Sequence, residues 1–144
     1  MRVSVQPGKV IPAWLRALVG AGLAVLLGWC SGPIIAWASG GFNPSAGFFL
    51  WVVGAFVCPW VACTVSNRWY LPIAMLASVA LSASLAYQRH LTFTRHGPRA
   101  FPDYDSSHWI FALSIVVTLL IGVFVSYAVR RIRAGAATAE EPGR

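Results

Sequence analysis

Four long apolar stretches without a charged residue divide this chain of 144 residues, and they cover residues 17–37, 46–65, 70–87 and 109–129. A helix needs about 20 predominantly apolar residues to cross the hydrocarbon core of a bilayer, and each stretch meets or approaches that length. We therefore predict an all-α, polytopic membrane protein. Its residues 1–144 form one transmembrane domain, a four-helix bundle with both termini in the cytoplasm.

Acidic residues are confined to the last part of the chain. The four are Asp103, Asp105, Glu140 and Glu141, so the first 102 residues carry no carboxylate side chain. Charged residues make up 10% of the chain, whereas a soluble domain carries about 25%. This scarcity excludes a soluble surface. The net charge of +7 does not indicate nucleic-acid binding, because the cations stand in connectors between apolar stretches rather than on one polar face.

The distribution of the eleven cations predicts the orientation. Eight lie in the N-terminal arm, the connector between the second and third stretches, and the C-terminal tail, and three lie in residues 88–108. Cytoplasmic segments carry an excess of Lys and Arg. Both termini are therefore predicted to be cytoplasmic, and residues 88–108 are predicted to form an outer loop. Arginine outnumbers lysine ten to one and alanine is abundant, which is typical of bacterial genes of high GC content, so the predicted location is a bacterial inner membrane.

Residues 1–38 allow a competing interpretation as a cleaved signal peptide. Cations precede the first apolar stretch, and Ala36-Trp37-Ala38 resembles a small-x-small cleavage site. The apolar stretch is too long for a signal peptide, and Pro33 with two isoleucines makes a poor polar region before the site. We therefore expect a retained first helix. Cleavage would leave the orientation of the other three helices unchanged.

Small residues recur at every fourth position in three of the four stretches. Lipid provides no hydrophobic drive between helices, so helices associate in membranes through close backbone approach and polar contacts at small-residue faces. Residues four apart lie on one face of a helix. The predicted packing positions are Gly20, Ala24, Gly28 and Gly32 in the first stretch, Ser78 and Ser82 in the third, and Ser114, Thr118, Gly122 and Ser126 in the fourth.

The absence of charge within the stretches argues against several mechanisms. Ionisable groups in a membrane mark proton relays and ion paths, and Ser, Thr and Cys have no His or Asp beside them at depth. We expect no enzyme activity and no cofactor. Imidazole and thiolate are ligands for zinc or copper, so five residues remain metal-site candidates, although their spacing fits no compact template: His90, His96, His108, Cys58 and Cys63.

The predicted outer loop carries arginine and aromatic side chains, a mixture suited to lipid headgroups or to an acidic partner surface. The partner-binding candidates are Arg89, Phe93, Arg95, Arg99, Phe101 and Tyr104. Pro98 and Pro102 prevent a continuous helix through this loop. Residues 133–144 are short, rich in Ala and Gly and mixed in charge, so we predict a disordered tail.

Three functions are compatible with these features. The leading hypothesis is a non-enzymatic inner-membrane protein that acts through contacts with another membrane protein or a second copy of itself, as an accessory or assembly subunit, a regulator or an immunity-type protein. An alternative is a small carrier or pore for a neutral or lipid-linked solute, which predicts a polar cavity between the first two helices around Ser31, Trp29 and Trp60. A second alternative is soft-metal transport through the membrane cysteines.

Overall fold

The structure is a computed structural model that describes residues 11–41, 44–66, 69–96 and 104–139. Four α-helices account for nearly all of these residues: α1 (Ala13–Gly41), α2 (Pro44–Val65), α3 (Tyr70–His96) and α4 (Tyr104–Ala139). Each is long and apolar enough to cross a membrane. The prediction of an all-α chain with four such helices is confirmed.

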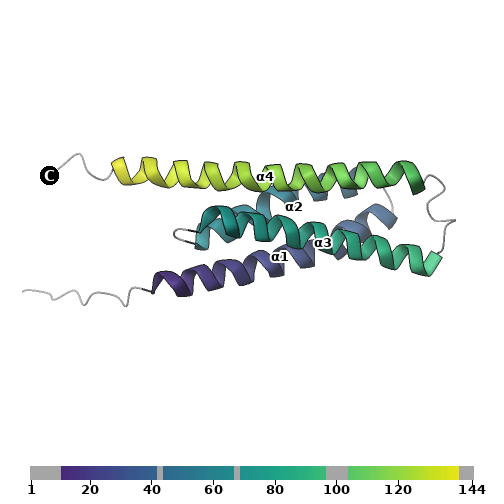
Figure 1. Cartoon of the computed structure of the whole chain (residues 1–144), viewed down its shortest axis with the longest axis horizontal. Coiled ribbons are helices and arrows are strands. Elements are labelled where there is room, and N and C mark those ends of the chain that lie inside the picture. Colours follow the sequence, from purple (N-terminus) through teal and green to yellow (C-terminus); the bar gives the residue numbers. More distant parts are fainter. Residues whose placement is uncertain (1–10, 42–43, 67–68, 97–103, 140–144) are drawn as a thin grey trace, which may run out of the picture.

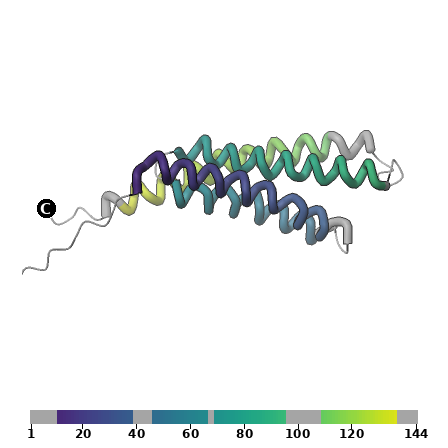
Figure 2. Tube along the Cα trace, turned by 90° about the horizontal axis from the view of Figure 1, so that it is seen from below, coloured from purple at the N-terminus to yellow at the C-terminus, as the bar shows by residue number. Residues whose placement is uncertain are grey.

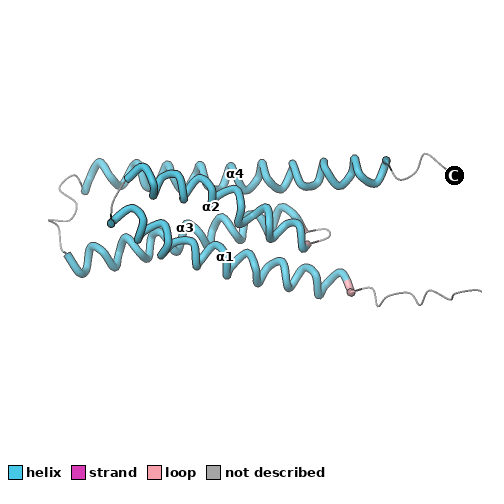
Figure 3. The backbone as a smooth tube through the Cα atoms, turned by 180° about the vertical axis from the view of Figure 1, so that it is seen from behind, coloured by secondary structure: helices cyan, strands magenta, loops and turns pink. Residues whose placement is uncertain are grey.

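The helices run side by side along one long axis (Figure 1), and the described part of the chain contains no strand (Figure 3). The start of α1 and the end of α4 lie at the same end of the bundle. We call this end, which also holds the connection between α2 and α3, the inner end. The opposite end, where α3 stops and α4 starts, is called the outer end.

Helix α3 makes the most extensive contacts in the bundle. Both α2 and α3 pack against each of the other three helices, whereas α1 and α4 pack mainly on these two. In the view of Figure 2, α1 crosses the bundle beside α3. A larger share of α3 is buried than of any other helix. The sequence of α3 explains this position, because alanine and serine on several of its faces allow neighbours to approach closely.

Ser66 and Trp69, on either side of the short connection between α2 and α3, are joined by hydrogen bonds to each other and to α2. The Ser66 N–H donates to the Ala62 carbonyl at 3.3 Å and so continues the ladder past the last residue of α2. The Ser66 hydroxyl accepts from the Trp69 N–H, also at 3.3 Å. Pro72 lies in the first turn of α3, where a missing N–H costs no helical hydrogen bond. Two antiparallel neighbouring helices result.

The predicted outer loop at residues 88–108 is wrong over most of its length. Helix α3 continues to His96 and α4 already begins at Tyr104. The prediction followed hydropathy, which falls after Tyr87, but residues 88–96 contain neither Gly nor Pro and have no reason to leave a helix that has started. Both Pro98 and Pro102 stand between the two helices, where a continuous helix was predicted to be impossible.

The predicted disordered tail at residues 133–144 is also wrong at its start, since α4 runs to Ala139. Alanine is the strongest helix former, and four of these seven residues are alanine. Tertiary contacts add to this propensity. The Arg133 guanidinium donates at 3.1 Å to the Ser66 carbonyl and to the Tyr70 hydroxyl, and it also donates to the Thr64 carbonyl. An arginine on carbonyls that end a helix stabilises that terminus, so Arg133 joins α4 to the inner end of α2.

The predicted packing face of α1 lies directly against α3. A Cβ atom placed on Gly28 would lie 2.7 Å from the Ala77 carbonyl oxygen and 2.9 Å from the Ala80 Cβ. One placed on Gly32 would overlap the Ser84 side chain. Real Cβ atoms do not approach other atoms so closely. Glycine at these two positions is therefore what allows the two backbones to come together.

The same arrangement joins α4 to α3. A Cβ on Gly122 would lie 2.4 Å from the Ser78 hydroxyl oxygen, and the neighbouring predicted positions Thr118 and Ser126 are buried. On α3, Ser78 and Ser82 are both buried. The first predicted position of α4, Ser114, is only half-buried. Close packing of α4 on its neighbours thus ends before the outer part of the helix.

Candidate functional site

A groove with a cavity of about 830 Å³ opens at the outer end of the bundle. We call it the outer groove. All four helices contribute: Ile35 and Ala36 from α1, Gly47, Phe48 and Trp51 from α2, Leu85, Gln88, Arg89 and Thr92 from α3, and Ile110, Phe111, Leu113, Ser114 and Val117 from α4. Its lining is predominantly apolar. Sites for small ligands commonly span about 300–1,000 Å³ and combine such a lining with a few polar groups.

A hydrogen bond between α2 and α4 closes the outer groove on the side of the bundle centre. The Trp51 indole N–H donates to the Thr118 hydroxyl oxygen at 3.1 Å, and this hydroxyl donates to the Ser114 carbonyl at 2.7 Å. The Trp51 ring also packs against Phe48, with ring centroids 5.5 Å apart. Trp51 therefore joins α2 to α4 and forms the floor of the groove.

The polar lining residues of α3 lie together at the other end of the groove. Gln88, Arg89 and Thr92 occupy adjacent turns of the helix. The Arg89 guanidinium carbon lies 5.1 Å from the centre of the Phe111 ring, so a cation–π contact links α3 to α4. The outer groove thus has an apolar body, a closed floor and a cationic entrance.

The structure separates the predicted partner-binding residues. Arg89 lines the outer groove, whereas Phe93 is half-buried outside its lining and Arg95 is exposed. Of Tyr104 only the backbone is described, and Arg99 and Phe101 lie outside the described residues. Among those of the six whose side chains the structure describes, Arg89 is the one that lies at a cavity.

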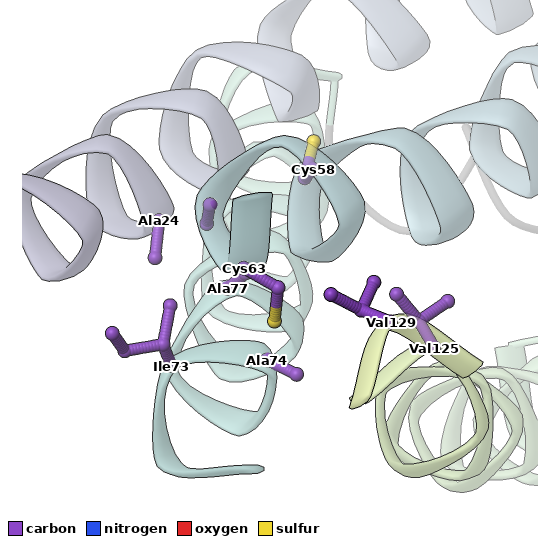
Figure 4. Close-up of a cluster of buried hydrophobic side chains, with 9 residues drawn as sticks. Ala24, Cys58, Cys63, Ile73, Ala74, Ala77, Val125 and Val129 are labelled. Carbon is purple, nitrogen blue, oxygen red and sulfur yellow. The ribbon is translucent and has the colours of Figure 1, made fainter. Parts of the chain in front are cut away.

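The metal-site candidates are not brought together. The Cys58 sulfur lies 3.3 Å from the Ser31 hydroxyl oxygen toward α1, whereas the Cys63 thiol donates to the Tyr70 carbonyl at 3.2 Å toward α3. Figure 4 shows the two sulfur atoms pointing in opposite directions, with Cys63 facing Val125 and Val129 of α4. All three cysteines are free thiols.

The histidines are the other predicted metal ligands. His90 is exposed on α3, and of His96 and His108 the structure describes only the backbone. Across the described residues, no three metal-ligating side chains form a group. The geometry therefore lends no support to a soft-metal path through Cys58 and Cys63.

The polar side chains between α1 and its neighbours bind one another or the backbone. The Ser31 hydroxyl donates to the Leu27 carbonyl at 2.6 Å, and the Ser84 hydroxyl donates to the Trp29 carbonyl at the same distance. The Trp29 ring packs on Tyr87 of α3 and is half-exposed, as is Trp60. These residues, around which the carrier hypothesis expects a polar cavity, do not line the outer groove.

Sequence reasoning missed the outer groove because its walls come from four separate segments. One signal was present: Gly47 and Ala36 are small residues near the ends of the first two apolar stretches, where a bulkier side chain would fill the space. Comparison of the chain with protein-family models, with curated proteins and with solved structures finds no match. The geometry of the site therefore carries the functional argument.

Proposed function

We propose that the chain is a non-enzymatic, multi-pass membrane protein that holds the hydrocarbon chain of a lipid or a lipid-linked molecule in the outer groove. The observation that carries the proposal is the groove itself, an apolar cavity of about 830 Å³ with polar groups at one end. It favours the lipid-linked form of the carrier hypothesis over partner contact alone. Binding of this kind needs no catalytic group.

The length of the groove supports a lipid rather than a helix as its occupant. Its α4 wall runs from Ile110 to Val117, which corresponds to about 10 Å at 1.5 Å per residue. One leaflet of the hydrocarbon core is about 15 Å deep, half of about 30 Å. The Trp51 to Thr118 hydrogen bond lies just beyond this wall, so a groove of this length offers a spanning helix of a partner contact over less than one leaflet. It matches about two thirds of the depth that a lipid chain of that leaflet occupies.

A matched pair of substitutions tests this proposal. Ala36→Phe places a ring in the outer groove, whereas Ala112→Phe adds the same ring on α4 at an exposed position outside the lining. Each variant is purified in mild detergent, and co-purified lipid is quantified by mass spectrometry. We expect Ala36→Phe to lose most of the bound lipid and Ala112→Phe to retain it. Equal lipid content in the two variants would contradict the proposal.

Contact with a partner membrane protein or a second copy of the chain is the second candidate. It is supported by Trp109 at the outer end of α4, which is 81% exposed and does not line the outer groove. The substitution Trp109→Ala should then remove a partner from pull-downs in mild detergent. As a control, Phe124→Ala changes another exposed aromatic residue elsewhere on α4. A partner retained equally by both variants would exclude this surface.

We also propose that both termini are cytoplasmic and that the membrane is a bacterial inner membrane. The support is the excess of cations in the terminal segments and the connector at the inner end. Alkaline phosphatase fused after Pro102 should be active, because that enzyme folds only outside the cytoplasm. Green fluorescent protein fused after Arg144 should be fluorescent. An inactive phosphatase fusion together with a dark fluorescent fusion would reverse the orientation.

A further inference from the structure

The hydroxyl groups that line the outer groove bind their hydrogens to the backbone. The Ser114 hydroxyl donates to the Phe111 carbonyl at 2.7 Å, and the Thr92 hydroxyl donates to the Gln88 carbonyl at 2.9 Å. Both serine and threonine are lining residues of the groove. A hydroxyl has one hydrogen to donate and two lone pairs with which to accept. With their hydrogens already bound to carbonyls, these two oxygens can still accept, so they favour a ligand that donates.

The Thr118 hydroxyl, at the floor of the groove, has both a donor and an acceptor. It donates to the Ser114 carbonyl at 2.7 Å and accepts from the Trp51 indole at 3.1 Å. Ser114 lies about one turn nearer to the outer end, and within the described part of the chain no donor is bonded to its hydroxyl oxygen. A donor of a ligand would form a hydrogen bond there in apolar surroundings, where water competes little.

Gln88 supplies the complementary group on α3. It lines the groove, and its side-chain amide carries two N–H donors. Helices α3 and α4 run in opposite directions (Figure 1), and the Arg89 contact with the Phe111 ring shows where they are level. Gln88 lies one residue deeper than Arg89 on α3. Ser114 lies three residues deeper than Phe111 on α4, so an amide donor and a hydroxyl acceptor both lie within one helical turn of that contact.

A hydroxyl group on the ligand matches this pair, because it donates one hydrogen bond and accepts another without carrying a charge. A charged amine also donates, but burying its charge among apolar lining residues is unfavourable. Ester and ether oxygens accept only, and they leave the Ser114 oxygen without a donor. Resting on the proposed function, we propose that the lipid in the outer groove is uncharged and ends in a hydroxyl group, which donates to Ser114 and accepts from Gln88.

A lipid alcohol and its methyl ether test the proposal. Immobilised protein in mild detergent is equilibrated with equal amounts of oleyl alcohol and oleyl methyl ether, and the bound amount of each is measured by mass spectrometry after washing. The ether keeps the chain and the oxygen but lacks the hydrogen that Ser114 would accept. We expect the wild-type protein to bind about threefold more alcohol than ether, the ratio that corresponds to a hydrogen bond of about 0.6 kcal/mol in a membrane protein.

Ser114→Ala and Ser126→Ala are matched variants. Both serines lie on α4 and donate at 2.7 Å to the carbonyl three residues earlier, but Ser126 does not line the outer groove. Ser114→Ala should lower the ratio of alcohol to ether to near unity without reducing binding of the ether, whereas Ser126→Ala should leave the ratio unchanged. Gln88→Leu should weaken binding of both probes, because both oxygens accept. An unchanged ratio in Ser114→Ala would overturn the proposal.

Ala36→Phe separates the failure of this inference from the failure of the proposed function. If this variant binds both probes as the wild-type protein does, the groove does not hold a chain and the proposed function is wrong. If it loses both probes while the wild-type protein binds alcohol and ether equally, only the hydroxyl group is wrong. Val117→Phe fills the groove from α4 and replaces Ala36→Phe should that variant not fold.

Discussion

Replacing Gly28 by alanine tests whether close contact between α1 and α3 holds the bundle together. The added Cβ would lie 2.7 Å from the Ala77 carbonyl oxygen, about 0.7 Å short of the 3.4 Å at which ordinary contact begins. It would also lie 2.9 Å from the Leu81 backbone nitrogen. Both atoms belong to the backbone of a helix, so no side-chain rotation relieves the overlap and the two helices must separate.

Two effects of opposite sign set the magnitude of this change. Forcing an extra methyl group into a packed interface costs about 1–3 kcal/mol. Replacing glycine by alanine within a helix stabilises it by up to about 1 kcal/mol. Gly22 isolates the first effect, because it lies on the same helix and a Cβ placed there meets no atom within 4 Å. Gly28→Ala should therefore be less stable than Gly22→Ala by about 1–3 kcal/mol.

The free energy of unfolding of both variants is measured by titration with sodium dodecyl sulfate in mixed micelles, with helicity as the readout. Gly22→Ala should equal or exceed the wild-type stability. The double substitution Gly28→Ala with Ala80→Gly should recover part of the loss, because it removes the 2.9 Å overlap with the Ala80 Cβ but leaves the one with the Ala77 carbonyl. Equal stability of Gly28→Ala and Gly22→Ala would refute the packing argument.

Three further predictions concern single contacts. Arg133→Met should destabilise the bundle by about 1–3 kcal/mol, because its charged hydrogen bonds to the inner end are lost. Amide hydrogen exchange should become faster near Ser66, and an unchanged exchange rate would contradict the role of Arg133 in joining α4 to α2. Trp51→Phe should lower the free energy of unfolding by about 0.6 kcal/mol, because the hydrogen bond to Thr118 is lost. A double-mutant cycle with Thr118→Val should give a coupling energy of that size. A coupling energy of zero would show that this hydrogen bond does not hold α2 and α4 together at the groove. All three cysteines lie within apolar spans, where a thiol forms little of the reactive thiolate. None should therefore react with a membrane-permeant maleimide in proteoliposomes, and all three should react after unfolding in sodium dodecyl sulfate. Labelling of Cys58 or Cys63 before unfolding would show that the core is open to water.

The number and type of the helices followed from hydropathy alone, but their ends did not. Apolar length predicted all four helices. It also ended the third helix at Tyr87, nine residues before its end at His96. Hydropathy measures affinity for lipid, whereas helix continuation depends on backbone propensity and on where Gly or Pro interrupts the chain. The two criteria differ wherever a helix projects beyond an apolar stretch.

For the packing positions too, spacing in the sequence predicted one part of the arrangement and the structure supplied the rest. Spacing of four residues placed Gly20, Gly28 and Gly32 on one face. The structure shows that this face meets α3 at Gly28 and Gly32, and both α2 and α3 at Gly20. Spacing cannot tell which helix lies opposite, nor that Ser114 borders a groove while Thr118 is buried. That distinction depends on how α4 packs on its neighbours, where the Trp51 indole of α2 binds the Thr118 hydroxyl.

Hydropathy and charge along the chain are enough to predict four apolar helices, cations between them and no charge within the predicted spans. Both properties are added up over neighbouring residues, so they can be evaluated without knowing which distant residues are in contact. The contact of Arg133 with the end of α2 and the position of Arg89 at an apolar groove appear in the folded bundle alone. Both depend on the rotation of one helix about its axis relative to another. That rotation is set by the packing of all four helices at once, because each small-residue face admits only those neighbours whose shape fits it.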